Sequence, residues 1–214
     1  MIALNVYKLR DDMEMPTYGT TLANCFDLSF QPSEQVVKGY DRFNSPVEKV
    51  VNNHGEILIS PGERLLIPTG LVFKLEQRIT VESYSDVLRE FPPLQTYSIR
   101  LHPRSGLSLK RGLVLANSEG IVDVDYQEEV FVLLTNISEM SATIKKNDRI
   151  AQAEVVSNIP AKFVVLNSKP EKHSERAGGF GSTGIQTPPV QRYAVSNETP
   201  PMEEWKVDGP TNFG

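Results

Sequence analysis

Cysteine is nearly absent from this chain, which has 214 residues and a lone thiol at Cys25. A single cysteine excludes an internal disulfide, and such scarcity favours a reducing compartment. The sequence also lacks any run of about 18 apolar residues, so we expect no membrane-spanning helix. Its first residues, MIALNVYKLRDD, become charged too early for a secretory signal peptide. We therefore expect a cytoplasmic protein with no membrane contact.

Positive charge is also in deficit, with 22 Lys and Arg against 27 Asp and Glu and a formal net charge of -5. Proteins that bind duplex nucleic acid usually carry a basic excess, so we expect no nucleic-acid partner. An anionic ligand would need a few placed arginines to create a local positive site.

Histidine is the third scarce residue, and its positions argue against a zinc site. His54, His102 and His173 lie far apart and have no cysteine at ligand spacing. Composition leaves a Ser-His-Asp triad open, but the G-x-S-x-G elbow is missing. The Walker consensus G-x-x-x-x-G-K-[ST] is missing too, which excludes an ordinary P-loop.

Short β-branched and apolar runs, separated by turn residues such as Ser60-Pro61-Gly62, fill most of the chain. Many short strands at close spacing predict an all-β jelly-roll barrel or sandwich. The expected strands are Ile57–Ile59, Arg64–Ile67, Leu71–Leu75, Tyr97–Leu101, Leu113–Ala116, Val130–Thr135 and Phe163–Leu166.

Three stretches are expected as additions to this β core. Residues 29–56 are polar and poorly periodic. Residues 77–95 contain a predicted surface helix that Pro92-Pro93 ends. Residues 185–214 form a proline-containing extension, expected as an irregular or extended arm. The β domain itself is expected to span residues 1–184.

Residues 103–110, PRSGLSLK, gather groups that suit an anion where a strand breaks. Arg104 can pair with phosphate oxygens in a fork, and Ser105 offers a short donor. Gly106 lets backbone N–H groups approach an anion closely. Taken alone, the segment is more typical of a plain surface turn.

Residues 112–130, GLVLANSEGIVDVDYQEEV, predict a hairpin with Gly120 in its loop. Asp123 and Asp125 stand in the otherwise apolar returning strand, where a carboxylate costs stability unless it has a partner or a task. The two aspartates also share one face of a strand, so a solvated face explains them as well.

Two later segments add polar groups. Residues 146–152, KNDRIAQ, place Arg149 and Gln152 as donors where a turn enters a strand. Residues 175–184, ERAGGFGSTG, contain four glycines whose N–H groups can surround a polyphosphate. A glycine-rich stretch near a terminus is more often a flexible linker, but a linker has no need of Phe180.

The order and spacing of these segments resemble one known family. PRSGLSLK (103–110), GIVDVDY (120–126), DRIAQ (148–152) and GGFGSTG (178–184) resemble motifs two to five of the homotrimeric dUTP diphosphatases, or dUTPases. Residues 60–75 resemble the segment before motif two, and residues 16–30 resemble motif one. The resemblance implies a jelly-roll homotrimer whose active sites are each shared by three chains. It implies Mg²⁺-dependent hydrolysis of dUTP to dUMP and pyrophosphate.

The resemblance also implies a role for each matching residue. Asp123 matches the aspartate that activates the attacking water, and Tyr126 matches the tyrosine that packs on the deoxyribose. Asp27 matches an aspartate near the water shell of Mg²⁺, which the phosphates mainly hold. The other implied substrate contacts are Asn117 and Phe180 at the uracil, and Arg104, Ser105, Gly106, Gln152, Arg176, Gly181, Ser182 and Thr183 around the phosphates.

Several features depart from the family pattern. Motif one reads ANCFDL where AGYDL is usual, Glu128 replaces a common glycine, and Arg176 lies one residue closer to GGFG. Together with the insertions, these differences suggest a phage or viral lineage and hence the host cytoplasm. In a regular strand Asp123 and Tyr126 would face opposite ways, so both can contact one sugar only if the chain bends between them.

Two alternative functions stay open on the same fold. A dCTP deaminase needs a glutamate three residues before an asparagine, but Leu133 stands three residues before Asn136. A regulatory or protein-binding module would use the additions, residues 29–56 or 185–214, to bind a protein partner. Retention of Asp123 favours the enzyme.

Overall fold

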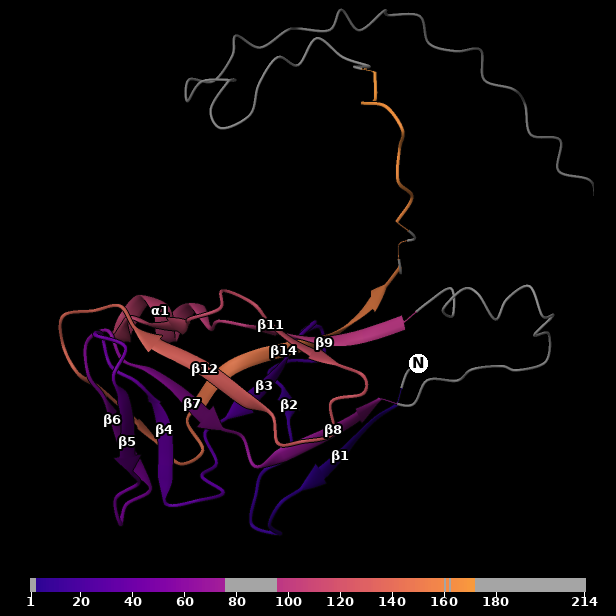
Figure 1. The fold of residues 1–214 in the computed structure, drawn as a ribbon. Helices are drawn as coiled ribbons and strands as arrows, with labels where there is room; N and C mark the ends of the chain where they lie inside the picture. The colour runs from indigo at the N-terminus through magenta and orange to yellow at the C-terminus, as the bar shows by residue number, and fades with distance from the viewer. Residues whose placement is uncertain (1–2, 76–95, 160, 162, 172–214) are drawn as a thin grey trace, which may run out of the picture. The chain divides into compact units, whose positions relative to one another are not determined.

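A computed structural model of the chain describes residues 3–75, 96–159, 161 and 163–171. Within these ranges it consists of short antiparallel strands and one short helix, α1 (Ser105–Arg111) (Figure 1). The strands are β1 (Leu4–Lys8), β2 (Thr17–Tyr18), β3 (Phe26–Ser29), β4 (Val36–Tyr40), β5 (Pro46–Val50), β6 (Glu56–Ile59), β7 (Arg64–Pro68), β8 (Leu71–Leu75), β9 (Thr96–His102), β10 (Leu113–Leu115), β11 (Gly120–Asp123), β12 (Phe131–Asn136), β13 (Ala142–Lys145) and β14 (Arg149–Asn158). In this part of the chain, no helix has the length and apolar character needed to cross a membrane.

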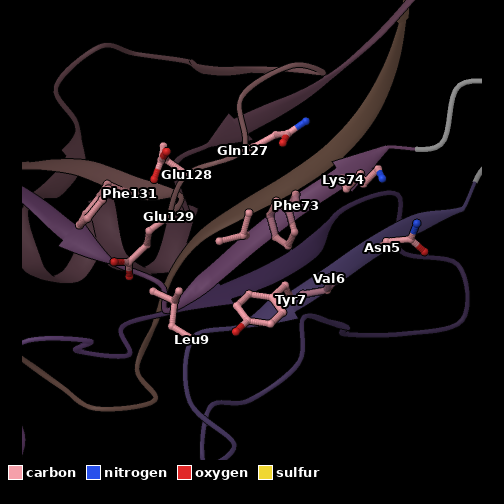
Figure 2. A pocket seen from close by; sticks show the side chains of 11 residues that line it. Asn5, Val6, Tyr7, Leu9, Phe73, Lys74, Gln127, Glu128, Glu129 and Phe131 are labelled. Atoms are coloured by element: carbon pink, nitrogen blue, oxygen red, sulfur yellow. The ribbon is translucent and has the colours of Figure 1, made fainter.

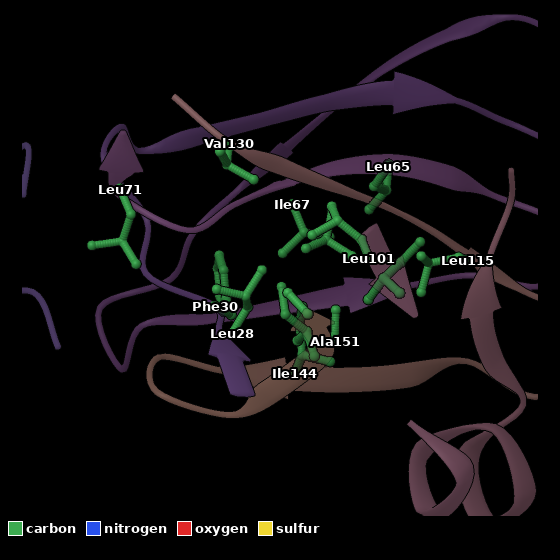
Figure 3. Packing of buried hydrophobic residues seen from close by; sticks show 14 of the residues in the cluster. Leu28, Phe30, Leu65, Ile67, Leu71, Leu101, Leu115, Val130, Ile144 and Ala151 are labelled. Atoms are coloured by element: carbon green, nitrogen blue, oxygen red, sulfur yellow. The ribbon is translucent and has the colours of Figure 1, made fainter. Parts of the chain in front are cut away.

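Most of the described strands belong to two five-stranded sheets. One sheet has the order β10-β12-β7-β4-β5, the other has the order β11-β9-β14-β3-β2, and β1-β8 and β6-β13 form separate pairs. Leu65 and Ile67 from the first sheet and Leu101 and Ala151 from the second are almost fully buried in one apolar cluster (Figure 3). The two sheets therefore pack face to face, and the all-β jelly-roll prediction is confirmed.

Burial alternates along the strands, which explains why the sequence predicts them. β7 buries Leu65 and Ile67 and leaves Leu66, between them, 45% exposed. This period of two follows from the pleat, which points successive side chains to opposite faces. Each fully buried Leu or Ile stabilises the fold by roughly 1.5–3 kcal/mol by leaving water. Six of the predicted strands are present as β6, β7, β8, β9, β10 and β12, with ends shifted by at most one residue.

The segment expected as a poorly periodic insertion, residues 29–56, forms regular structure instead. Its hairpin of β4 and β5 extends the first sheet through the contact between β4 and β7. Gly39 permits this contact, because a Cβ there would lie 2.1 Å from the carbonyl oxygen of Arg64. The pattern hid the strand because only Val37 is buried along β4, which leaves too little alternation to detect.

The predicted strand at residues 163–166 is wrong. These residues adopt no strand, and their side chains are strongly exposed, with Phe163 at 96%. Four consecutive apolar residues carry no alternation, and β-structure needs a neighbouring strand that the described residues do not supply here. The described residues up to Phe163 belong to one compact unit.

The predicted hairpin across residues 112–130 is also wrong in its pairing. β10 pairs with β12 and β11 pairs with β9, so the chain crosses between the two sheets near Asn117. Both strands alternate, and the sequence shows alternation without showing which partner each strand takes. The helix expected within residues 77–95 and the extension at residues 185–214 lie outside the described residues.

Candidate active site

An arginine pair holds Asp27 at one end of the second sheet. Arg104 Nε lies 3.0 Å from Asp27 Oδ1, and Arg149 Nη1 lies 2.9 Å from Asp27 Oδ2. The Asp27 side chain is 13% exposed, whereas Arg149 is 53% exposed. Two guanidinium groups around one carboxylate leave an excess positive charge here, although the whole chain is acidic. An anion can therefore bind at this end of the sheet.

The backbone around this arginine pair is fixed by further hydrogen bonds. Gln152 on β14 lies opposite Asp27 on β3, and its Nε2 donates to the Pro103 carbonyl at 3.3 Å. Arg104 Nη1 donates to the Arg149 carbonyl at 3.0 Å. The structure thus brings together Asp27, Arg104 and Gln152, which the sequence analysis assigned from three separate motifs.

Helix α1 begins directly after Arg104, where the sequence predicted a turn. The amides of Leu107 and Ser108 both donate to the Arg104 carbonyl. Residues 105–111 show no apolar periodicity that would predict a helix, because α1 buries none of its residues. Ser105 and Gly106 lie exposed in its first turn. A Cβ at Gly106 would meet no heavy atom within 4 Å, so packing inside the described chain does not require glycine there.

A second group of residues surrounds β11. Asn117 is exposed in the turn before this strand, and Asp123 is exposed at its last residue. The Tyr126 amide donates to the Asp123 carbonyl at 3.1 Å, which closes a turn. The bend expected between Asp123 and Tyr126 is therefore present.

Tyr126 is oriented by its own hydroxyl group. The ring is 40% exposed, and its hydroxyl donates to the Glu129 carbonyl at 2.9 Å. Burial, followed by the nearby carboxylates of Glu128 and Glu129, raises the pKa of Tyr126. The phenol therefore stays protonated at neutral pH and keeps its role as donor.

The sequence analysis missed Glu129, which links three parts of the fold. Its Oε1 accepts from the Gly70 amide at 2.7 Å, and its Oε2 accepts from Ser33 Oγ at 2.8 Å. Burial raises the pKa of Glu129, although these two hydrogen bonds act in the opposite direction. No sequence signal identified this carboxylate, because its partners lie 59 and 96 residues away.

An open groove of about 720 Å³ lies beside Glu129 (Figure 2). It is lined by residues of β1, β8 and the segment after Tyr126, including Tyr7, Phe73 and Phe131. The groove is distinct from the arginine pair at Asp27, because no residue of that cluster lines it.

The two groups of candidate residues lie far apart within one chain. Asp123 lies opposite Ser98 of β9, whereas Gln152 lies opposite His102 of the same strand. Four residues at a rise of about 3.3 Å separate these positions by roughly 13 Å. Arg104 comes two residues after His102, the last residue of β9, on the side away from Ser98. Within one chain, Asp123 and the arginine pair therefore occupy separate positions along the second sheet.

The candidates of the glycine-rich motif, Arg176, Phe180, Gly181, Ser182 and Thr183, lie outside the described residues. The described residues also bear on metal binding. Among the residues that the structure describes, no group of three or more His, Cys, Asp or Glu side chains is arranged to hold a metal ion.

Comparison with known proteins identifies relatives for most of the chain. Residues 62–184 match the family model described as dUTPase. The chain is 33% identical over 182 residues to the deoxyuridine 5'-triphosphate nucleotidohydrolase of Nautilia profundicola, in an alignment that covers 85% of this chain and 98% of the relative.

Solved structures share the fold. A mutant dUTPase of Staphylococcus bacteriophage 80alpha, solved with dUpNHpp, has a TM-score of 0.59 at 20% identity and covers 86% of this chain and 99% of its own. A mutant dUTPase from phage phi11 of S. aureus, described in terms of the coordination of a structural Mg(II) ion, has a TM-score of 0.53 at 15% identity. That alignment covers 79% of this chain and 99% of the phage protein.

Proposed function

This chain belongs to the dUTPase family, and on that premise we propose that it hydrolyses dUTP to dUMP and pyrophosphate. The observation that carries the proposal is the turn from Asp123 to Tyr126. It leaves a carboxylate and an aromatic ring exposed on one short bend. A general base and a ring that packs on a sugar need such a bend to reach one nucleotide.

The reaction assigned to Asp123 is general-base catalysis. Its carboxylate takes a proton from a water molecule while the water oxygen bonds to the α-phosphorus. The bond from the α-phosphorus to the bridging oxygen breaks, and pyrophosphate leaves with the electron pair. Tyr126 packs on the deoxyribose and leaves no room for a 2′-hydroxyl, and Asn117 binds the uracil edge.

The phosphates are assigned to the opposite end of the sheet. Arg104, Ser105 and Gly106 supply a guanidinium, a hydroxyl and an unobstructed backbone, and Gln152 adds an amide donor. The open space at Gly106 supports this assignment, because close approach by a ligand explains a glycine that packing and backbone conformation do not require.

Magnesium fits this arrangement as an ion that arrives with the substrate. Both carboxylate oxygens of Asp27 are already paired with guanidinium groups, so Asp27 would reach the ion through water. Mg²⁺ usually keeps several waters and binds substrate phosphates, and when bound it offsets the charge of the leaving pyrophosphate. Arg104 and Arg149 share that task from the protein side.

We assign the assembly as a homotrimer, as the family membership implies. In this assignment Asp123 and the arginine pair of one site come from different chains. Cyclic symmetry then creates three equivalent sites. Arg176, Phe180, Gly181, Ser182 and Thr183 are assigned to the substrate from the third chain.

The deaminase alternative gains no support from the structure. Asn136 is fully buried, and its Nδ2 donates to the carbonyls of Ile59 and Met140 at 2.9 and 2.7 Å. This asparagine serves the packing of β12 and is not available to a substrate.

The proposed function is tested by pyrophosphate release with Mg²⁺ from dUTP, dCTP, dTTP and UTP. We expect turnover of dUTP well above that of the others. Asp123→Asn should reduce it by about 10²–10⁴-fold, which is the usual contribution of a general base. Comparable release from dCTP, or full activity in Asp123→Asn, would contradict the proposal.

A further inference from the structure

The loop that carries Tyr126 is fixed to the core through Glu129. The Tyr126 hydroxyl donates to the Glu129 carbonyl, and the Glu129 side chain accepts from Ser33 and Gly70. Figure 2 shows Glu129 and its neighbour Glu128 pointing to opposite sides of the loop. Glu128 is exposed, whereas Glu129 is half-buried. One residue therefore joins the ring of Tyr126 to two distant segments.

The turn between β7 and β8 is built to meet this carboxylate. Gly70 has a φ of +67°, and a Cβ there would lie 2.1 Å from Met13 Sδ, so glycine is required for this backbone. Beside it, Thr69 Oγ1 donates to the Val130 carbonyl at 2.6 Å. The Val130 amide in turn donates to the Leu71 carbonyl at 2.9 Å.

Two sets of contacts attach the segment after Tyr126 to the core, one at Val130 and one at Glu129. Val130 is tied to the turn by backbone and Thr69 contacts that do not involve Glu129's carboxylate. The Glu129 carbonyl that Tyr126 binds shares one planar peptide with the Val130 amide, so the contact with Leu71 holds that carbonyl too. The carboxylate adds a second attachment of the same residue, to Gly70 and Ser33. Its removal also leaves the buried Gly70 amide without its acceptor, which destabilises the fold.

We propose that Glu129 is a positioning residue that holds the Tyr126 ring in place against the deoxyribose and thereby helps to reject ribonucleotides. The inference rests on the proposed function, because it requires Tyr126 to pack on the sugar. Steric exclusion of a hydroxyl depends on a close fit, so a ring that shifts or rotates loses discrimination before it loses binding.

Two substitutions separate shape from charge at this position. Glu129→Ala removes both acceptor atoms. Glu129→Gln preserves the geometry, because its Oε1 can accept from the Gly70 amide while its Nε2 donates to Ser33 Oγ. We expect the alanine variant to lower the ratio of kcat/KM for dUTP over UTP by about 10-fold, within the range of one steric contact in a pocket. Glutamine should restore most of that ratio.

The experiment measures kcat and KM for dUTP and UTP in wild type, Glu129→Ala, Glu129→Gln and Tyr126→Phe. UTP is also tested as a competitive inhibitor, so that weak turnover does not hide its binding. Glu128→Ala is the matched control, since it removes an exposed carboxylate from the same loop. Thermal unfolding is recorded for every variant.

A lowered ratio in Glu129→Ala and Tyr126→Phe, with recovery in Glu129→Gln and no change in Glu128→Ala, is the result we expect. An unchanged ratio in Glu129→Ala, even with a lower unfolding temperature, would show that Glu129 serves stability alone. If Glu129→Ala does not fold, Tyr126→Phe breaks the same link without removing the carboxylate, and an unchanged ratio there overturns the inference. Absence of dUTP turnover in wild type would instead overturn the proposed function, and this inference with it.

Discussion

Gly106 shows how one residue without a side chain points to a ligand. It lies in the first turn of α1, where a Cβ would meet nothing within 4 Å and where its φ is not in the left-handed region. Neither packing nor backbone geometry in the described chain explains the glycine. Close approach of phosphate does explain it, as the resemblance implied for this position.

Gly106→Ala is therefore expected to fold normally and to lose activity. Alanine in a helix is favoured over glycine by roughly 0.5–1 kcal/mol, so the unfolding free energy should rise or stay unchanged. The added methyl group should obstruct the phosphates and lower kcat/KM for dUTP at least about 10-fold. Denaturant unfolding tests the predicted stability, and steady-state kinetics test the predicted loss of activity. Full activity in Gly106→Ala would show that this residue does not belong to the phosphate site.

Glu129 gives a prediction about pH. Burial raises the pKa of this carboxyl above its ordinary value of 4.5, so the folded chain favours the protonated form. The resulting stability is present below about pH 4.5 and is lost as the pH rises through the raised folded-state pKa. Glutamine at this position does not titrate, so the unfolding temperature of Glu129→Gln should rise relative to that of wild type as the pH increases above about 4.5.

A pH series of thermal unfolding measures this difference. Glu128→Gln, which changes the exposed neighbour in the same loop, is the matched control. A difference between Glu129→Gln and wild type that stays flat, or falls as the pH rises, would contradict the assignment of a buried, destabilised carboxylate to Glu129.

At the scale of elements, the sequence predicted strands well and their neighbours poorly. The strands β6 to β10 and β12 followed from alternation, which is local and visible in any short window. The pairing of β10 with β12 and of β11 with β9 depends on contacts between distant residues. Helix α1 stayed hidden because it buries nothing, and β4 stayed hidden because it buries little.

For the candidate site too, the sequence indicated residues in motifs but not contacts between distant residues. The motif resemblance selected Asp27, Arg104 and Gln152 as site candidates, and the structure brings these three residues together. Their roles at the site stay predictions. The contacts of Glu129 were not predictable, because Ser33 and Gly70 are remote in sequence and neither belongs to a recognisable motif. The roles assigned to Asp123 and Tyr126 remain predictions, although the bend that these roles require is present.

The β4–β5 hairpin provides a prediction at this scale. Gly39→Ala would place a Cβ 2.1 Å from the Arg64 carbonyl oxygen, which is backbone and cannot yield without moving β4 from β7. We expect a loss of about 1–3 kcal/mol in unfolding free energy, as for other overpacked sites. Gly19→Ala is the matched control, because a Cβ at Gly19 meets nothing within 4 Å. Equal stability of the two variants in urea would show that β4 does not approach β7 so closely.

At the scale of the whole molecule, the distance along β9 is the deciding feature. Asp123 lies opposite Ser98 of β9, and Gln152, beside the arginine pair, lies opposite His102, roughly 13 Å farther along the strand. In the proposed homotrimer, each catalytic site takes Asp123 from one copy of the chain and the arginine pair from another.

The central claim is tested most directly by mixing two inactive variants, Asp123→Asn and Arg104→Ala, after each has been denatured and refolded alone and together. If every site takes its aspartate from one chain and its arginine from another, random mixing at equal amounts leaves about a quarter of the sites intact. The account therefore predicts that dUTP hydrolysis returns to about one quarter of the wild-type level in the mixture. A mixture as inactive as either variant alone would contradict it, because both residues would then have to serve the same site from the same chain.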